Sequence, residues 1–148
     1  MTEPRKEVAP PFQLPLINHK GQEMSLADLH GKPVIMTFWV TWCPACQHDL
    51  PQKEVFYRSI KGGNVAFITV NVTGRESDPN KVLHFLKEHR LTFPVLRDEG
   101  TKTYDAYEIT AVPTTVLIDP DGFIVGRFDE TVPFVNVLSR LGKYIHNE

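Results

Sequence analysis

The chain has 148 residues, of which 41% are hydrophobic and 23% are charged, and this length and composition suit one globular domain. Sixteen lysines and arginines against eighteen aspartates and glutamates give a net charge of −2. Because no long basic run accompanies this balance, we expect no nucleic-acid partner. The longest apolar runs are far too short to span a membrane, and the first residues lack the apolar core of a secretory signal.

The N-terminal part predicts a flexible arm and a small hairpin. Residues 1–10 are polar and contain prolines, so we expect a loose arm there, with a single domain over residues 11–148. Phe12 to Ile17 predicts a short edge strand, because Pro15 fits only an edge or a bulge. A turn and a short return strand should follow, and Ser25 is typical of the N-cap of a short helical turn.

Two continuous apolar runs predict strands that are buried on both faces. They cover Val34 to Val40 and Val65 to Val72, and both are rich in β-branched and aromatic residues. A helix should lie between them, from Pro44 to about Lys61, with a kink at Pro51. The order strand, helix, strand predicts a parallel βαβ unit.

The second half of the chain predicts three helices and an antiparallel hairpin. Asp78 and Pro79 suit the N-cap and first position of a helix that ends near His89, with its inward side chains at Val82, Leu83 and Leu86. The hairpin is predicted from two strands around a strong turn signal at residues 119–122. The remaining predicted elements are a short strand at Phe93–Leu96, a short helix at Lys102–Tyr107, the hairpin strands Thr114–Asp119 and Phe123–Phe128, and a final helix from Thr131 to about His146 with Val135, Leu138 and Leu141 inward.

The only two cysteines, Cys43 and Cys46, have the spacing Cys-x-x-Cys. A zinc site normally needs four protein ligands, or three and a water molecule, and covalent haem needs a histidine directly after the second cysteine, where Gln47 stands. An inert structural pair is the remaining plain alternative. The redox interpretation explains more, because a pair that follows a buried strand and opens a helix is typical of thioredoxin-like chemistry.

The predicted helix start explains how these residue types would act. Cys43 would lie at the N-cap or first position, where free N–H groups and the helix dipole favour the thiolate, which is the reactive form. Cys46, one turn further, should be more buried and attack the mixed disulfide that Cys43 forms. Pro44 should stiffen the first turn, and Trp42 should form an apolar wall beside the sulfur, whereas Trp39 is interpreted as a core residue.

At this point the chain resembles the thioredoxin superfamily, and within it the extracytoplasmic ResA/TlpA-like thiol-disulfide oxidoreductases. The resemblance runs from Pro11 to about Gly142 and rests on four segments, APPFQLPLINHKGQEMSLADLHGKPVIMTFWVTWCPAC, VAFITVNV, LTFPVLRD and YEITAVPTTVLIDPDGFIVG. It implies an α/β, thioredoxin-like fold, in which a central mixed sheet is flanked by helices and carries an added N-terminal β-hairpin. It also implies that Pro113 is a cis-proline beside the cysteines, and that a substrate segment pairs with the backbone of Val112.

The resemblance also directs attention to Asp49. Thioredoxin has a buried acid in the strand before the motif, where this chain has Thr37, whereas ResA-like proteins carry an acid three residues after the second cysteine. Asp49 occupies that position and shares a helix face with Cys46. We expect it to tune the cysteine pair and to move its proton, although the family usually has the longer glutamate; a solvated surface acid is the alternative.

The sequence thus predicts a thiol-disulfide oxidoreductase with Cys43, Cys46 and Asp49 as catalytic residues and Trp42, Pro44, Val112 and Pro113 as the substrate-binding set. A reductant of protein disulfides, with apocytochrome c as one substrate, is the main hypothesis, and an oxidase or isomerase of the same fold is the alternative. A peroxiredoxin-like peroxidase is disfavoured by Met36 and Val40 in place of the expected proline and threonine, and a copper carrier by the short cysteine spacing.

The expected partners follow from the same hypothesis. No nicotinamide or flavin fingerprint appears, so we expect no cofactor and no metal, and turnover would need electrons from an upstream membrane thiol carrier. The resemblance implies an extracytoplasmic location, either periplasmic or on the outer face of the membrane, with any anchor absent from this sequence; a cytoplasmic location is the alternative. A monomer is expected.

Overall fold

The structure, a computed structural model, describes residues 6–145 and is built on a six-stranded mixed sheet with strand order β1-β8-β7-β4-β5-β6. β4 pairs in parallel with β5 and antiparallel with β7, which places it near the middle of the sheet. β2 and β3 form a separate antiparallel hairpin. The strands are β1 (Glu7–Val8), β2 (Gln13–Pro15), β3 (Glu23–Ser25), β4 (Val34–Trp39), β5 (Ala66–Asn71), β6 (Val95–Arg97), β7 (Thr114–Ile118) and β8 (Phe123–Phe128).

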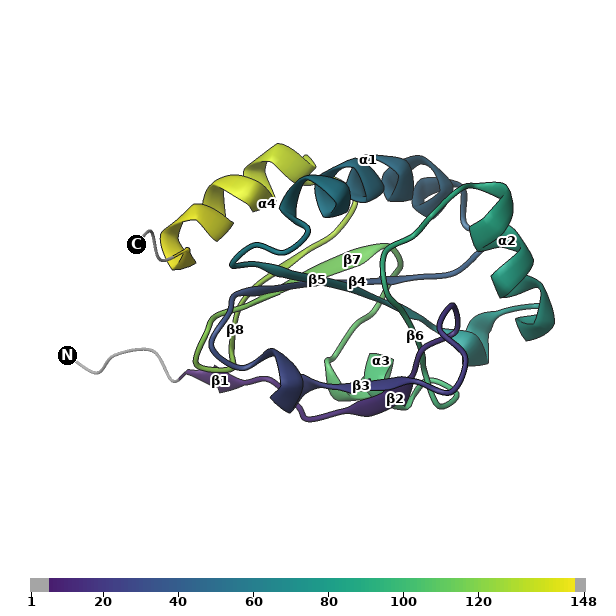
Figure 1. Cartoon of the computed structure of the whole chain (residues 1–148), viewed down its shortest axis with the longest axis horizontal. Helices are drawn as coiled ribbons and strands as arrows, with labels where there is room; N and C mark the ends of the chain where they lie inside the picture. The colour runs from purple at the N-terminus through teal and green to yellow at the C-terminus, as the bar shows by residue number, and fades with distance from the viewer. Residues whose placement is uncertain (1–5, 146–148) are drawn as a thin grey trace.

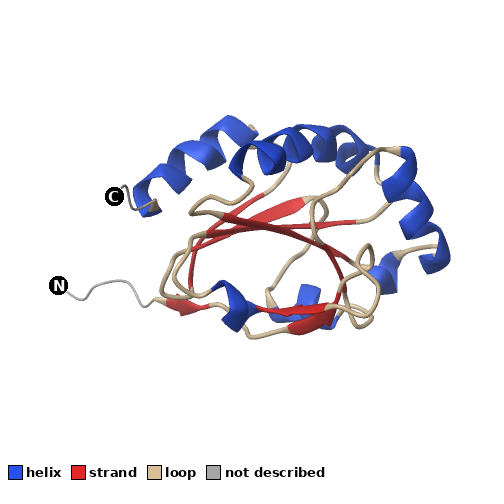
Figure 2. Ribbon diagram, in the orientation of Figure 1, coloured by secondary structure: helices blue, strands red, loops and turns tan. Residues whose placement is uncertain are grey.

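Helices and the hairpin cover the two faces of this sheet. Figure 1 shows α1, α2 and α4 along one side, and α3 with the β2–β3 hairpin along the other. Figure 2 shows the central strands of the six-stranded sheet between these two groups, whereas the hairpin strands lie on the side of α3. The helices are α1 (Pro44–Ile60), α2 (Val82–Glu88), α3 (Lys102–Ala106) and α4 (Phe134–Leu141). Within residues 6–145, no helix has the length and apolar character needed to cross a membrane.

The middle strand β4 has every residue buried, as its continuous apolar run predicts. Phe38 and Trp39, at its C-terminal end, are fully buried and contact the rings of Tyr104 and Phe85 respectively. Aromatic packing of this kind fixes the end of the strand, and the cysteine motif begins four residues later at Cys43. The core therefore provides a rigid base for the motif.

One of two predicted helix starts is confirmed by its capping hydrogen bonds, and the other is confirmed only in part. Ser25 and Asp28 form a reciprocal capping box at the short 3₁₀ helix Leu26–Leu29. The Asp78 carboxylate accepts a hydrogen bond from the Asn80 N–H at 3.1 Å, but it caps a 3₁₀ turn, Pro79–Lys81, and not α2 itself.

Residues 7–9 of the predicted N-terminal arm are ordered against the sheet, which contradicts that part of the prediction. Glu7 and Val8 pair with Phe123 and Ile124 of β8 and form the edge strand β1. Ala9 is buried, and its N–H donates to the carbonyl of Gly122 at 2.9 Å. Residues 1–5 of the expected arm lie outside the described residues.

Two side chains predicted to face the core are exposed. Leu83 is 38% exposed, because the inward face of α2 is set by Val82 and Leu86. The prediction of Val135 as an inward residue is also wrong, since it is 65% exposed. The final helix begins at Phe134, after the N-cap Pro133 and not at Thr131, and its buried side chains are Phe134, Val137 and Leu141. Leu138 packs partly buried against the core, and a short 3₁₀ turn, Gly142–Tyr144, follows α4; His146 lies outside the described residues.

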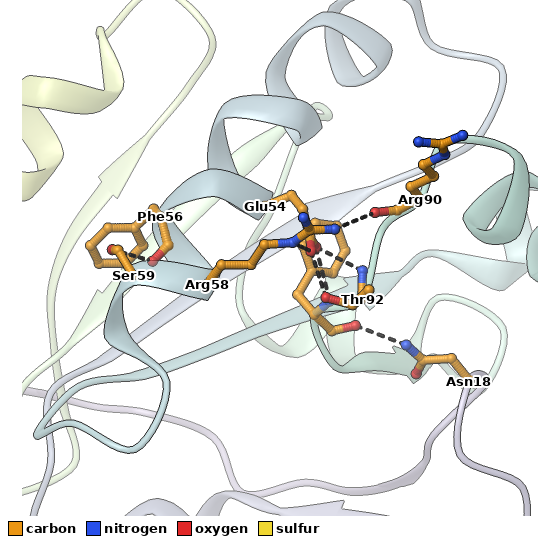
Figure 3. A network of polar contacts seen from close by, with 8 residues as sticks. Asn18, Glu54, Phe56, Arg58, Ser59, Arg90 and Thr92 are labelled. Carbon is orange, nitrogen blue, oxygen red and sulfur yellow. Dashed lines mark hydrogen bonds and ion pairs between the residues drawn. The ribbon is translucent and has the colours of Figure 1, made fainter.

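The buried carboxylate of Glu54 ties α1 to the segment before β6. It accepts hydrogen bonds from the N–H groups of Thr92 at 2.7 Å and Phe93 at 3.1 Å, and from the Thr92 hydroxyl. Figure 3 shows Arg58, one turn along α1, reaching over the same carboxylate, with a 2.7 Å contact to Glu54 and a 3.3 Å bond to the carbonyl of Arg90. The helix that begins at the cysteine motif is therefore held by polar contacts as well as by apolar packing.

Candidate active site at the Cys43–Cys46 pair

The two cysteines lie at the start of α1, directly after β4. Cys43 is the N-cap of the helix, and its backbone is extended. Its sulfur accepts a hydrogen bond from the N–H of Cys46, with a distance of 3.2 Å between Sγ and N. This is the position predicted for Cys43, at a helix N-terminus where N–H groups have no partner within the helix.

The two thiols differ in their burial. Both cysteines are free, and Cys43 is 7% exposed, whereas Cys46 is completely buried. Burial raises the pKa of the Cys46 thiol well above its usual range, and the hydrogen bond and charge of Cys43 and the charge of Asp49 act in the same direction. Cys43 is therefore the more accessible of the two thiols, and Cys46 is the one whose ionisation its surroundings disfavour.

The loop before β7 lies against Cys43. The peptide bond between Val112 and Pro113 is cis, as expected, and Pro113 is buried. The Cys43 thiol donates to the carbonyl oxygen of Val112, at 3.7 Å between Sγ and O. Two segments that are 69 residues apart in the sequence thus meet at the reactive sulfur.

Pro44 and Trp42 lie directly on either side of Cys43. Pro44 is the first residue of α1 and is exposed. Trp42 is 56% exposed, and its indole N–H donates to the carbonyl of Arg75 at 2.9 Å. This contact turns the ring towards the loop after β5 and leaves an exposed aromatic surface beside the motif.

The acid of the site lies on the helix and not in the strand. Thr37, in the strand position of the thioredoxin acid, is fully buried and shares a 2.9 Å hydrogen bond with the Thr115 hydroxyl. Asp49 is partly buried on α1, three residues after Cys46, and forms an ion pair with Lys53. Gln52 also donates to the Asp49 carboxylate, at 3.1 Å. The prediction of a solvated surface acid therefore does not describe this side chain.

Sequence reasoning missed Lys53 and Glu76. Lys53 was overlooked because lysine is normally exposed on a helix, and its i,i+4 spacing from Asp49 was the available signal. Glu76 accepts hydrogen bonds from the Thr41 N–H at 2.8 Å and hydroxyl at 2.6 Å, and from Asn71 at 2.7 Å. It therefore fixes the segment that leads into Cys43.

The described residues offer a redox pair without a metal centre. Across residues 6–145, no three His, Cys, Asp or Glu side chains gather into a group able to hold a metal ion. A free dithiol with one shielded and one approachable sulfur, next to a cis-proline loop, is suited to exchange with another disulfide.

Known proteins resemble this chain in sequence and in fold. Residues 6–127 match the AhpC/TSA family. The thiol-disulfide oxidoreductase ResA of Oceanobacillus iheyensis is 35% identical over 143 residues, which cover 95% of this chain and 71% of that protein. ResA of Bacillus subtilis is 37% identical over 117 residues, covering 79% and 63% of the two chains. Among solved structures, StoA from Bacillus subtilis is 28% identical, has a TM-score of 0.74, and the match covers 91% of this chain and 98% of that one.

Proposed function

The chain belongs to the AhpC/TSA family and is a thiol-disulfide oxidoreductase with a thioredoxin-like fold, and from this premise we propose that it reduces disulfides in other proteins. The observation that carries the proposal is the environment of the Cys43 sulfur compared with that of Cys46. The Cys43 sulfur accepts the N–H of Cys46 and lies against the carbonyl of Val112, while Cys46 is fully buried. This arrangement separates an attacking thiol from a resolving thiol.

The reaction follows from this separation. The Cys43 thiolate attacks one sulfur of a substrate disulfide, and a mixed disulfide forms as the other substrate sulfur leaves as a thiolate. Cys46 then loses its proton and attacks the Cys43 sulfur. The Cys43–Cys46 disulfide forms, the bond to the substrate breaks, and two electrons have passed from the protein to the substrate.

We assign substrate binding to the surface around Cys43. An extended substrate segment would pair with the backbone of Val112, which is only half-buried, in the manner of strand addition. The exposed ring of Trp42 and the exposed Pro44 would contact the residues that flank the substrate cysteine. The buried Pro113 would form the base of this binding surface. In this arrangement backbone pairing provides affinity that does not depend on the substrate sequence.

Asp49 is assigned to the resolving step. It shares a helix face with Cys46, and its charge adds to the rise in the pKa of that thiol. A carboxylate placed there can take up the proton that Cys46 releases, directly or through one water molecule. Asp49 then passes the proton to solvent.

The direction of electron flow and the place of action belong to the same proposal. The relatives are named thiol-disulfide oxidoreductases, and the resemblance of the sequence to the extracytoplasmic ResA/TlpA-like branch favours a reductant that works outside the cytoplasm. Candidate substrates include the Cys-x-x-Cys-His segment of an apocytochrome c. A membrane thiol carrier would return the protein to its dithiol form, because the site holds only the two electrons of one cysteine pair.

A reduction assay tests this function. Reduced protein is mixed with one equivalent of an oxidised Cys-x-x-Cys-His peptide at pH 7, and alkylated products are counted by mass. We expect most of the peptide to become a dithiol while Cys43 and Cys46 become a disulfide. The converse experiment starts from oxidised protein and reduced peptide. If that direction ran to completion instead, the protein would be an oxidant and the proposal would fail.

A further inference from the structure

Lys53 is a buried lysine in an ion pair with Asp49. Its side chain is 5% exposed and that of Asp49 is 16% exposed, and the ammonium group contacts the carboxylate Oδ2. The same ammonium lies over the Phe134 ring of α4, at 5.2 Å from the ring centroid. Lysines are rarely this buried unless they are paired, and here the partner is the Asp49 carboxylate.

The pair is placed next to the redox centre. Cys46, Asp49 and Lys53 are spaced by three and four residues on α1, so they form one row along the helix. Asp49 and Lys53 also line a small cavity of about 10 Å³ together with Pro113 and Thr115. A cavity of this size is near the smallest that admits a water molecule. The row thus extends from Cys46 to the cavity that Pro113 lines.

The charges that face Lys53 come from several elements. Asp49 lies on its own helix, the acids Asp129 and Glu130 line the same cavity from the segment after β8, and Cys46 acts on it through its charge. Burial lowers the pKa of Lys53, while Asp49 and a Cys46 thiolate raise it. Because charge interactions are mutual, a charged Lys53 makes the Cys46 thiolate easier to form.

We propose that Lys53 is a positioning residue for the resolving step: its ammonium group holds the Asp49 carboxylate beside Cys46 and offsets the negative charge that ionisation of Cys46 creates. The inference rests on the proposed function, in which Cys46 resolves a mixed disulfide on Cys43. In that step the Cys46 proton moves to Asp49. The Cys46 thiolate bonds to the Cys43 sulfur, and the substrate sulfur leaves with the electron pair of the broken bond. Lys53 exchanges no atom or electron.

The two half-reactions with dithiobis-nitrobenzoate test this role separately. The first thionitrobenzoate ion is released when Cys43 attacks the reagent, and the second when Cys46 resolves the mixed disulfide. Both are followed by stopped-flow absorbance from pH 5 to pH 10. In Lys53→Met we expect the second release to be about tenfold slower at pH 7 and its pH profile to move upward by about one unit, because a nearby positive charge is lost. The first release should change by less than about twofold, because the change does not touch Cys43.

Three further variants complete the design. Lys53→Arg keeps the positive charge and should recover most of the rate of the second release. Asp49→Asn should also slow this release, and the Asp49→Asn/Lys53→Met variant should be no slower than the slower single variant, because the two residues act as one unit. Lys87→Met removes an exposed lysine of α2 and serves as the matched control. If Lys53→Met does not fold, Lys53→Gln carries the same expectation.

The outcomes separate this inference from the proposed function. If the second release kept its wild-type rate and pH profile in the Lys53 variant, or if losses in the double variant multiplied, the role of Lys53 would be refuted. If the wild-type protein showed no first release, or no second release after it, the dithiol mechanism itself would fail whatever the Lys53 variants did.

Discussion

Replacing Cys46 by serine should stop turnover and trap the protein as a mixed disulfide through Cys43. The serine hydroxyl is not ionised near neutral pH, so it cannot resolve the bond that Cys43 forms. Dithiol turnover should fall by at least about 10³-fold, the scale on which loss of a nucleophile lowers enzymatic rates. Because Cys46 is fully buried, its replacement by serine should leave the surface around Cys43 unchanged. The measurement is intact mass after incubation with oxidised glutathione, which should show one added glutathione.

The matched control for this result is Cys43→Ser. It should lose turnover to the same extent and should form almost no adduct, because the remaining thiol is shielded and its pKa is raised. A stable adduct on Cys43→Ser together with none on Cys46→Ser would reverse the assigned roles. Thermal unfolding of both variants shows whether the fold is retained.

Replacing Glu54 by glutamine should lower the free energy of unfolding by about 2 kcal/mol at pH 7, since a charged acceptor of several hydrogen bonds is removed. Phe93 is fully buried, so water cannot replace the lost acceptor at its N–H, and a glutamine offers one acceptor oxygen in place of two. For a chain of this length the melting temperature should fall by about 4–8 °C. Urea unfolding gives the free energy directly.

The pH dependence of this difference provides its own check. Burial alone raises the pKa of the Glu54 carboxyl, but hydrogen bonds from Thr92, Arg58 and Phe93 outweigh it, and the net pKa is lowered. A lowered pKa in the folded state means that the stabilisation is fully present above the unfolded value, about 4.3, and is lost as the pH falls through the folded value. Wild type and Glu54→Gln should therefore converge in acid. Glu88→Gln, which removes a carboxylate that is 62% exposed, should change stability little at any pH. An equal loss in both variants would contradict the role of Glu54.

Much of the fold follows from local patterns in the sequence. The continuous apolar run from Val34 to Val40 predicts a strand buried on both faces, and the observed strand Val34–Trp39 lies near the middle of the sheet. Pro44 correctly predicts the start of α1, and the turn signal at residues 119–122 correctly predicts the hairpin between β7 and β8. Both signals act within a few residues. The site cysteines followed from their spacing and from this strand–helix context.

Other features depend on information that local patterns do not hold. Val135, Leu138 and Leu141 share a helical spacing, and so do Phe134, Val137 and Leu141, which are the buried side chains of α4, so the local pattern alone does not choose between the two faces. The bonds from Glu54 to Thr92 join residues 38 apart, and those from Glu76 to Thr41 join residues 35 apart. A charged side chain on a helix or loop is normally solvated, so its burial becomes visible only when the distant partner is placed.

The central claim, that this dithiol is a reductant, is tested most directly by the midpoint potential of the Cys43–Cys46 couple at pH 7. The protein is equilibrated with glutathione or dithiothreitol buffers, and the fraction of dithiol is counted after alkylation. A reductant should show a value near or below about −250 mV, close to that of thioredoxin. A value near about −120 mV, close to that of a strong oxidant such as DsbA, would contradict the claim and would make the protein a donor of disulfides.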